Sequence, residues 1–194
     1  MKNKIDIIKS NFIQAQGYLS SFINDSNNFV KIENAANLII SAFTDKKKLI
    51  SCGNGGSMCD AMHLAQELSG NFKVKRRPLP AIAISDPAYM SCVLNDYDSE
   101  LIFSRFIQSI GQSGDILFAI STSGNSKNII RAAEIARKKK IKIISLTGNN
   151  GGDLAKFSDI EIRVNQDSFS DRIQEIHIKI IHSIVNYIEI NMNL

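Results

Sequence analysis

The feature that most restricts the fold is the alternation of short apolar runs with longer stretches of helical periodicity. The runs read KLISC, AIAIS, ILFAI, KIISL and IEIRV, at residues 48–52, 81–85, 116–120, 142–146 and 160–164. The first four are almost continuously apolar, as strands covered on both faces are. Helical stretches of about 10–20 residues between such strands are typical of βαβ units. The sequence therefore predicts an α/β fold with a largely parallel sheet.

Helices are predicted on both sides of this alternating region. The first 45 residues carry two apolar stripes at three- and four-residue steps, interrupted at Asp25 and Ser26, and so predict a helical pair. A long helix is predicted from Asp171 to about Ile190, with isoleucines on several of its faces. A helix that is apolar nearly all round is buried, and we expect another subunit to cover this one.

Composition favours one domain in a reducing compartment. A chain of 194 residues that is 44% hydrophobic is long enough for one sizeable core, so residues 1–194 are predicted to form a single domain. Cys52, Cys59 and Cys92 form no even-numbered framework and no zinc-ribbon spacing, which indicates reduced thiols and a cytoplasmic location. No apolar run approaches the 18 residues that a membrane span needs.

The charge is mildly positive and favours an anionic small molecule. The formal net charge is +4, and the basic runs at 46–48, 73–77 and 138–140 fall between predicted elements with little aromatic interleaving. That pattern is more typical of a solvated surface than of a nucleic-acid site. We therefore expect neither a nucleic-acid nor a membrane partner, whereas a positive balance favours anionic ligands.

The loop STSGNS, which directly follows the third apolar run, is suited to a phosphate group. It offers four hydroxyls, from Ser121, Thr122, Ser123 and Ser126, and Gly124 allows a tight backbone turn. A helix opening at about Ser126 adds free N–H groups and the positive end of a helix dipole. The alternative is an ordinary helix cap in a polar loop, which needs only one hydroxyl.

The loop CGNGGS, which follows the first apolar run, is not a nucleotide-binding loop. It lacks the Gly-Lys-Ser/Thr ending of a P-loop, Met58 stands where a dinucleotide fingerprint needs a small residue, and no acid follows about 20 residues on. The pattern disfavours ATP and NAD. The glycines indicate instead that backbone N–H groups and Asn54 approach a polar substrate closely.

Titratable side chains follow that loop and recur in the last helix. If a helix starts near Ser57, His63 and Glu67 lie one turn apart on the same face. Such a pair is most often a surface pair, but the adjacent glycine loop favours a functional role. The segment DRIQEIHIKIIH adds His177 and His182, and their spacing alone indicates no more than hydrogen-bonded structural histidines.

Six segments together resemble the phosphoheptose isomerase family of the sugar isomerase (SIS) superfamily. They are SCGNGGSMCDAMHLAQELSGNF, PAIAISD, FSRF, GDILFAISTSGNS, SLTGNNGG and RIQEIHIKIIH, collinear from about residue 48 to 185. The resemblance implies a three-layer α/β/α sandwich with a largely parallel five-stranded sheet. It also implies an aldose–ketose isomerase that converts sedoheptulose 7-phosphate to D-glycero-D-manno-heptose 7-phosphate through an enediolate, as the first step of nucleotide-activated heptose biosynthesis for lipopolysaccharide core.

The resemblance further implies roles for individual residues. The acid/base pair would be Glu67 and His182. One Zn²⁺ per subunit would be held by His63, Glu67, Gln174 and His182. Members are homotetramers with active sites shared between subunits, so the helices within residues 1–45 would pack on the domain and on its partners. Substrate contacts would come from Asn54, Gly55, Gly56, Glu67, Asn95, Asp96, Ser121, Thr122, Ser123, Ser126 and Gln174.

The chemistry agrees with this transfer and raises two difficulties. Moving a carbonyl between C2 and C1 needs a base for the carbon-bound proton and a second group for the enediolate oxygen. A glutamate held by zinc is a poorer base, so Glu67 is not expected to do both jobs at once. Gln174 and His182 are also separated by about 12 Å of helix rise, so one ion is shared only if their side chains lean together.

Two alternatives belong to other functional classes. Non-catalytic SIS proteins that bind the bacterial replication initiator lack the acid and the histidine equivalent to Glu67 and His182, whereas this chain has both. An SIS module that senses another sugar phosphate would be compatible with the loop STSGNS, but it would leave this pair unexplained. In addition, the segment NDYDSELIF lacks the Gly-Phe that usually follows the tyrosine, so the shape of that loop is open.

Overall fold

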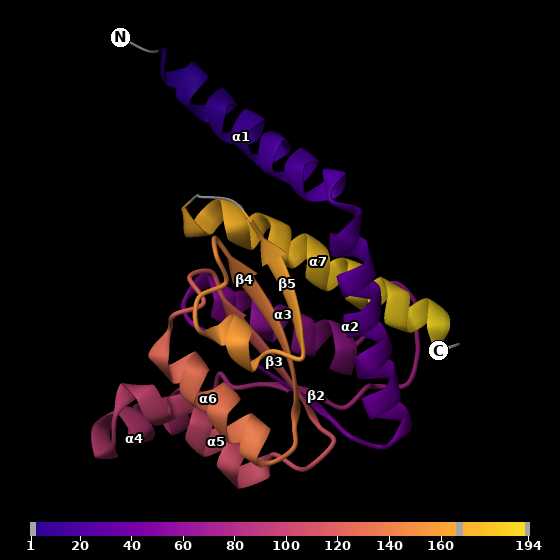
Figure 1. Ribbon diagram of the computed structural model, residues 1–194, viewed down its shortest axis with the longest axis vertical. Coiled ribbons are helices and arrows are strands. Elements are labelled where there is room, and N and C mark those ends of the chain that lie inside the picture. The colour runs from indigo at the N-terminus through magenta and orange to yellow at the C-terminus, as the bar shows by residue number, and fades with distance from the viewer. Residues whose placement is uncertain (1–2, 166–168, 193–194) are drawn as a thin grey trace.

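A computed structural model describes residues 3–165 and 169–192, and its five strands form one parallel sheet (Figure 1). The strand order is β2-β1-β3-β4-β5, and each neighbouring pair is parallel. All five apolar runs form strands, which confirms the predicted sheet. The strands are β1 (Leu49–Gly53), β2 (Ala81–Ala83), β3 (Ile116–Ser121), β4 (Lys142–Gly148) and β5 (Ile160–Val164).

Strand β2 departs from the prediction that the first four strands are covered on both faces. Strands β1 and β3 are buried throughout and β4 is buried except at Lys142, but β2 has only three residues, and Ile82 is 41% exposed. The reason is its position, because β2 lies at the edge of the sheet and pairs only with β1. Apolar sequence alone does not distinguish an edge strand from a central one.

Helices cover both faces of the sheet, which confirms the three-layer sandwich. Successive strand residues point to opposite faces, so Leu117 packs in one core and Phe118 in the other. Short 3₁₀ turns, η1 (Ser99–Leu101) and η2 (Leu154–Phe157), complete the connections. One core lies under α2 (Ser26–Thr44), α3 (Gly56–Ser69) and α7 (Ser170–Asn191), and the other under α4 (Pro87–Asp96), α5 (Ile102–Ile110) and α6 (Lys127–Lys138).

Helix α7 forms where the sequence predicts it, but its apolar residues are covered by this chain and not by another subunit. Its isoleucines Ile173, Ile176, Ile180 and Ile184 are buried within this one chain. They pack in the same core as α2, α3 and one face of the sheet, and α7 crosses that layer in Figure 1. The expectation that another subunit covers these residues is therefore wrong, because the chain itself supplies the apolar cover.

Helix α1 (Lys4–Asn24) extends away from the rest of the molecule in Figure 1. The break after it falls at Asp25, as predicted, where the carboxylate accepts a hydrogen bond of 3.0 Å from the backbone N–H of Asn27 and caps α2. Phe22 is its only buried residue among those described, while Ile8 and Phe12 are 60% and 75% exposed. The predicted apolar stripe exists, but most of it is uncovered within one chain.

The topology fixes where a ligand can bind. From β1 the chain moves outward to β2 and then crosses back to β3 on the other side of β1, so β1 and β3 flank a topological switch point. Ligands of open parallel sheets bind beyond the carboxyl ends of the strands at such a point. The glycine loop and the hydroxyl loop follow these two strands. In the described part of the chain, no helix has the length and apolarity that crossing a bilayer requires.

Candidate active site

A cavity of about 290 Å³ opens beyond the carboxyl ends of β1 and β3. It brings together the glycine loop, the hydroxyl loop and the start of α7, three segments that are far apart in the sequence. Their joint presence at the switch point is what the sequence predicts for a polar, phosphate-bearing ligand. The lining residues are Asn54, Gly55, Gly56, Ser57, Ile120, Ser121, Thr122, Ser126, Ser170 and Gln174.

The hydroxyl loop is shaped as a cradle rather than as a simple helix cap. Gly124 has φ +66°, a left-handed conformation that glycine adopts without strain, and its N–H donates to the Ser121 carbonyl at 3.0 Å. The Ser121 hydroxyl donates to the Ser126 hydroxyl at 3.2 Å, and Ser126 makes no side-chain capping bond to α6. Because the ordinary capping contact is missing, the alternative of a plain helix cap is not what forms here.

Ser123 differs from the other three hydroxyl residues of the loop. Its hydroxyl accepts a hydrogen bond of 3.1 Å from the N–H of Asn125, and the residue is exposed outside the cavity lining. The structure therefore places Ser121, Thr122 and Ser126 around the cavity and gives Ser123 a bond within the turn.

The glycine loop is braced from two sides. Asn54 exchanges two amide hydrogen bonds of 2.9 Å each with Asn128 in the first turn of α6. A Cβ at Gly56 would approach the Gln174 side-chain oxygen to 2.5 Å, so a larger residue here would displace the Gln174 amide from its present position. The Gln174 amide lies 3.5 Å from the Ser57 hydroxyl. Sequence reasoning missed Asn128, although its place one residue into α6 after the hydroxyl loop was a signal.

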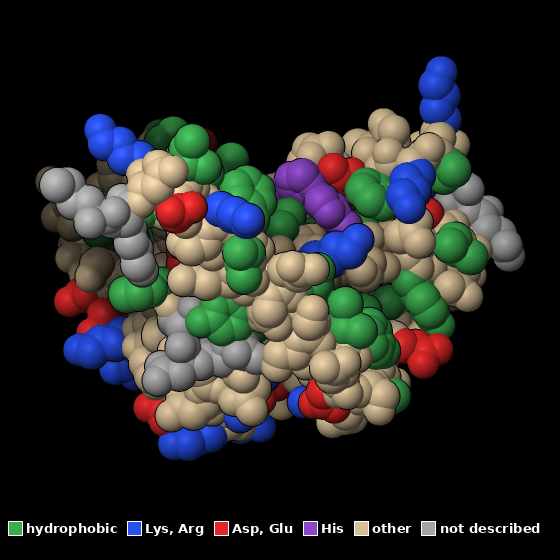
Figure 2. Space-filling model, turned by 90° about the horizontal axis from the view of Figure 1, so that it is seen from above, with side chains coloured by type: hydrophobic (Ala, Val, Ile, Leu, Met, Phe, Trp, Pro, Cys, Tyr) green, Lys and Arg blue, Asp and Glu red, His purple; other side chains and the backbone are tan. Residues whose placement is uncertain are grey.

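A second cluster, formed by His63, Glu67 and His182, lies further along α3 and α7. The His63 Nε2 lies 3.1 Å from the Glu67 Oε1 and 3.0 Å from the His182 Nε2. The carboxylate only accepts, so the His63 Nε2 carries the proton and the His182 Nε2 faces it with a lone pair. Histidine side chains reach the surface on the face shown in Figure 2. The helix spacing predicted the His63–Glu67 face, the family resemblance implied His182, and the structure places His182 beside His63.

His182 is kept neutral by its surroundings. Burial lowers its pKa below the ordinary value, the nearby His63 lowers it further, and Glu67 opposes them. The ring of Phe72 stacks on the imidazole with centroids 5.5 Å apart and an interplanar angle of 23°. A neutral imidazole beside a carboxylate is an arrangement that can accept a proton and return it.

Asp60 lies on α3 between the two clusters and was not singled out from the sequence. It is 8% exposed, its Oδ2 has no hydrogen-bond partner within the described residues, and burial raises its pKa to about 6. The signal was its spacing, because Asp60, His63 and Glu67 follow the three- and four-residue steps of one helix face.

The four zinc ligands implied by the family pattern do not come together within one chain. Gln174 lies beside Ser57 at the cavity, whereas His182 lies beside His63, so the eight-residue separation on α7 is not bridged. Across residues 3–165 and 169–192, no three His, Cys, Asp or Glu side chains are arranged to hold a metal ion. The two imidazoles and the carboxylate have the right donor chemistry for zinc, but their placement does not fit a complete site.

Asn95 and Asp96 lie outside the cavity lining. They occupy the C-terminal end of α4, where the Asn95 amide donates to the Asp96 carboxylate at 2.7 Å and the Cys92 thiol contacts the same carboxylate at 3.5 Å. Their role in substrate binding stays a prediction, because one chain does not bring them into the cavity.

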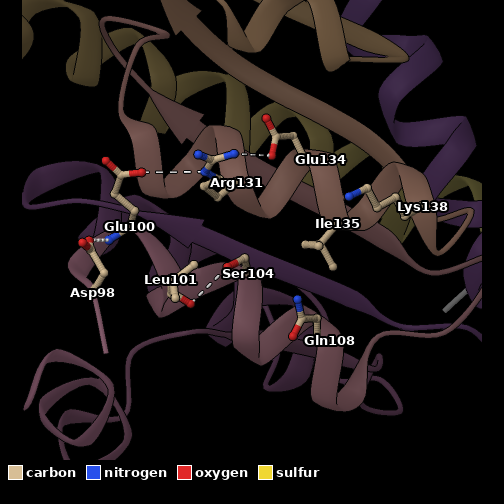
Figure 3. A pocket seen from close by; sticks show the side chains of 9 residues that line it. All are labelled: Asp98, Glu100, Leu101, Ser104, Gln108, Arg131, Glu134, Ile135 and Lys138. Atoms are coloured by element: carbon tan, nitrogen blue, oxygen red, sulfur yellow. Dashed lines mark hydrogen bonds and ion pairs between the residues drawn. The ribbon is translucent and has the colours of Figure 1, made fainter. Parts of the chain in front are cut away.

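Another cavity, of about 370 Å³, lies between η1, α5 and α6 (Figure 3). At its rim, Arg131 pairs with Glu100 at 3.7 Å and with Glu134 at 3.0 Å, and Lys127 pairs with Glu100 at 3.0 Å, so the two carboxylates are matched by two cations. It contains none of the site residues predicted from the sequence. We therefore place the candidate site at the switch point.

This chain is similar in sequence to known proteins. The model of the SIS domain family matches residues 12–148. The phosphoheptose isomerase of Glaesserella parasuis is 54% identical over 179 residues, 92% of this chain and 93% of that protein. The phosphoheptose isomerase of Vibrio cholerae is 50% identical over 187 residues, 96% of this chain and 98% of that protein.

Solved structures show the same likeness. A phosphoheptose isomerase from Francisella tularensis matches with a TM-score of 0.90 and 36% identity, over 96% of this chain and 98% of that one. The phosphoheptose isomerase from Neisseria gonorrhoeae matches with a TM-score of 0.89 and 31% identity, over 96% and 99%. Sequence and fold thus agree over nearly the full length of the described chain.

Proposed function

The chain belongs to the phosphoheptose isomerase family of SIS domains, and from this premise we propose how its site acts on a sugar phosphate. It is an isomerase that interconverts sedoheptulose 7-phosphate and D-glycero-D-manno-heptose 7-phosphate, a ketose–aldose pair. The further proposal is that this step opens nucleotide-activated heptose biosynthesis for lipopolysaccharide core. The observation that carries the mechanism is the cluster of Glu67, His63 and His182, which lies further along α3 and α7, the two helices whose first turns line the polar cavity.

In this proposal the phosphate end of the sugar binds at the hydroxyl loop. Ser121, Thr122 and Ser126 donate hydrogen bonds to the phosphate oxygens, and the N-terminus of α6 adds its positive dipole end. The glycine loop approaches the middle of the open chain, where Gln174 closes the cavity. The reacting carbons are then directed along α3 toward Glu67 and His182, because a seven-carbon chain separates its carbonyl end from its phosphate.

The chemical step needs one proton carried between two carbons. A base removes a proton from C1, and the C2 carbonyl becomes an enediolate oxygen that takes up a proton. The C1 hydroxyl then loses its proton as the C1 carbonyl forms, and the proton taken from C1 is returned to C2. Glu67 and His182 supply the carboxylate and the neutral imidazole for these transfers, and His63 bridges them. Protonation of the developing oxygen stabilises the enediolate, which is where such sites gain most of their rate.

The test is a coupled isomerase assay on Glu67→Gln and His182→Ala. Glu67→Gln keeps the approximate size of the side chain, and His182→Ala removes only the ring. Both proteins should therefore fold, while turnover falls at least ~100-fold. Glu134→Gln is the matched control, because Glu134 also lies on a helix in an ion pair, with Arg131, but outside the site. Near-normal turnover by either site variant would refute the roles given to this pair.

Zinc stays a separate proposal. The family pattern gives His63, Glu67, Gln174 and His182 as the residues that would hold it, which would require Gln174 to leave Ser57 and move toward the histidines. A bound Zn²⁺ would polarise the sugar carbonyl. We expect purified protein to contain about one zinc per chain and to lose activity on chelation. Metal analysis that finds no zinc in protein of full activity would remove the ion from the proposal.

We also propose a homotetramer in the cytoplasm. Support for the assembly comes from the uncovered apolar stripe of α1 and from the position of Asn95 and Asp96 outside the cavity of their own chain. Support for the compartment comes from the cysteines, since Cys52, Cys59 and Cys92 are free thiols.

The other two functional classes are less well supported. A replication-initiator-binding protein or a sugar-phosphate sensor has no need of a neutral imidazole held against a carboxylate-bound histidine. The paired Glu67 and His182 are explained by catalysis alone among the three.

A further inference from the structure

A buried carboxylate ties the loop after α3 to the end of α7. Glu189 is 5% exposed and accepts three hydrogen bonds, from the backbone N–H of Phe72 at 3.2 Å, from that of Lys73 at 3.1 Å and from the Arg76 Nε at 2.8 Å. The three donors lie more than a hundred residues earlier in the chain. The loop therefore has a fixed position relative to α7.

The arginine of this pair continues the network to α3. The side chain of Arg76 is completely buried, and its two terminal nitrogens donate to the backbone carbonyls of Leu68 at 2.8 Å and Glu67 at 2.6 Å. The last carbonyls of a helix have no partner within the helix, so these bonds fix the final turn of α3. Glu67 lies in that turn.

The other arm of the network ends at His182. The backbone N–H of Phe72 is bound by Glu189, and the Phe72 ring stacks on the His182 imidazole. Glu189 and His182 are seven residues apart on α7, which is two helical turns on one face. One buried ion pair thus reaches both members of the proposed acid/base pair through backbone and ring contacts.

We propose that Glu189 and Arg76 are positioning residues of the isomerase, which hold Phe72 against His182 and hold the last turn of α3 beneath Glu67. Neither residue touches the substrate or the reacting atoms, and the inference rests on the roles proposed for Glu67 and His182. Stability alone is a weak reason for such a pair, because a buried ion pair often contributes little net stability compared with apolar residues of similar volume. A positioning role explains why the pair is ionic. Its directional hydrogen bonds fix the geometry of the groups that they join, whereas apolar contacts are not directional.

The first experiment measures kcat and KM for Glu189→Gln and Arg76→Lys. Gln places an N–H donor against Arg76, and Lys keeps the charge but loses the fork that reaches the α3 carbonyls. We expect kcat to fall about 10- to 100-fold in each, as for displaced supporting residues in other sites, with KM within about 3-fold of wild type. The phosphate end of the substrate is bound elsewhere, which is why KM should change little.

Asp115→Asn is the matched control for a merely structural effect. Asp115 is 1% exposed and, like Glu189, accepts hydrogen bonds from two backbone N–H groups and one cation. The donors are the backbone N–H groups of Lys48 and Gln112 and the Lys48 ammonium, at distances of 2.6–3.1 Å. It immediately precedes β3, at the amino ends of the strands, whereas the site lies beyond their carboxyl ends. We expect this variant to lose a similar amount of thermal stability and to keep kcat within about 2-fold.

A spectroscopic measurement reports the contact itself, independently of turnover. The chain has only three histidines, so protein labelled with ¹³C in the histidine rings gives three separable signals, and His182→Ala identifies one of them. Phe72→Leu removes the ring current over His182 and shifts that signal. Glu189→Gln should shift the same signal in the same direction, and Asp115→Asn should leave it in place.

The outcomes separate this inference from the function it rests on. A Glu189→Gln protein that is folded and retains wild-type kcat and an unshifted His182 signal overturns the inference, as does an equal loss of kcat in Asp115→Asn. If Glu67→Gln and His182→Ala turn over normally, the proposed mechanism fails instead. In that case, a shifted His182 signal in Glu189→Gln still supports the mechanical part of the inference, and an unshifted one refutes it.

Discussion

Two histidines five residues apart on α7 have opposite surroundings. His177 is completely buried, and its Nε2 donates to the Thr147 carbonyl at 3.0 Å, so its Nδ1 is unprotonated and has no partner among the described residues. Burial lowers the pKa of His177 to about 4, and the hydrogen bond to Thr147 opposes it only in part. His182 faces His63 instead. The sequence places both among isoleucines, and only the packing of α7 on β4 distinguishes the structural histidine from the one proposed to react.

His177 predicts a loss of stability in mild acid. In the unfolded chain His177 takes up a proton near pH 6.5, whereas in the folded chain it does so only near pH 4. Its contribution to the free energy of unfolding is therefore complete above pH 6.5 and is lost as the pH falls toward 4. Between pH 7 and pH 5 the free energy of unfolding should fall by about 2 kcal/mol from this residue. Urea unfolding of wild type and His177→Leu at both pH values tests this, and equal pH dependence in the two proteins would contradict it.

At the scale of elements, two neighbouring loops shape each other. The hydroxyl loop after β3 is bonded to the loop after β4, since the Thr122 carbonyl accepts from the Gly148 N–H and the Gly124 carbonyl from the Leu154 N–H, each at 2.9 Å. The sequence predicted both strands and the turn at Gly124. It could not predict which loop lies against the cradle, because that depends on the order of the strands and not on the composition of either loop.

Gly124→Ala should therefore impair phosphate binding. A Cβ at Gly124 would overlap the Gly151 carbonyl, and a left-handed φ costs a non-glycine residue about 1–2 kcal/mol, so the loop must shift away from its neighbour. We expect KM for the sugar phosphate to rise at least ~10-fold. Gly17→Ala is the control, because Gly17 lies in α1 with nothing within 4 Å of its Cβ and alanine favours a helix. Unchanged KM in Gly124→Ala would show that the cradle is not the phosphate site.

For the whole molecule, sequence patterns predicted the helices and strands that form the three layers. They did not predict which apolar helix faces are covered within the chain. The sequences of α1 and α7 both carry apolar periodicity. The periodicity of α7 indicated a partner contact, and the family resemblance implied one for α1. In the structure most isoleucines of α7 lie in the core of their own chain and Ile190 is exposed, whereas α1 is nearly uncovered. The difference arises from the turn at Asp25, which directs α1 away from the sheet (Figure 1). The sequence indicates where that turn is but not the direction that the helix takes from it.

The uncovered stripe of α1 predicts the assembly state. Ile5, Ile8 and Phe12 are 68%, 60% and 75% exposed, and fully burying each such side chain contributes about 1.5–3 kcal/mol. The exposed stripe predicts contacts between subunits, and for the homotetramer proposed above wild-type protein should have a mass of about 86 kDa, four chains of 21.5 kDa, by light scattering. Phe12→Glu combined with Ile8→Glu introduces charges that a buried stripe cannot accommodate, so the mass should fall. Gln14→Glu, on the polar side of the same helix, should leave it unchanged. A monomeric wild type, or a double variant of undiminished mass, would show that this stripe does not hold the subunits together.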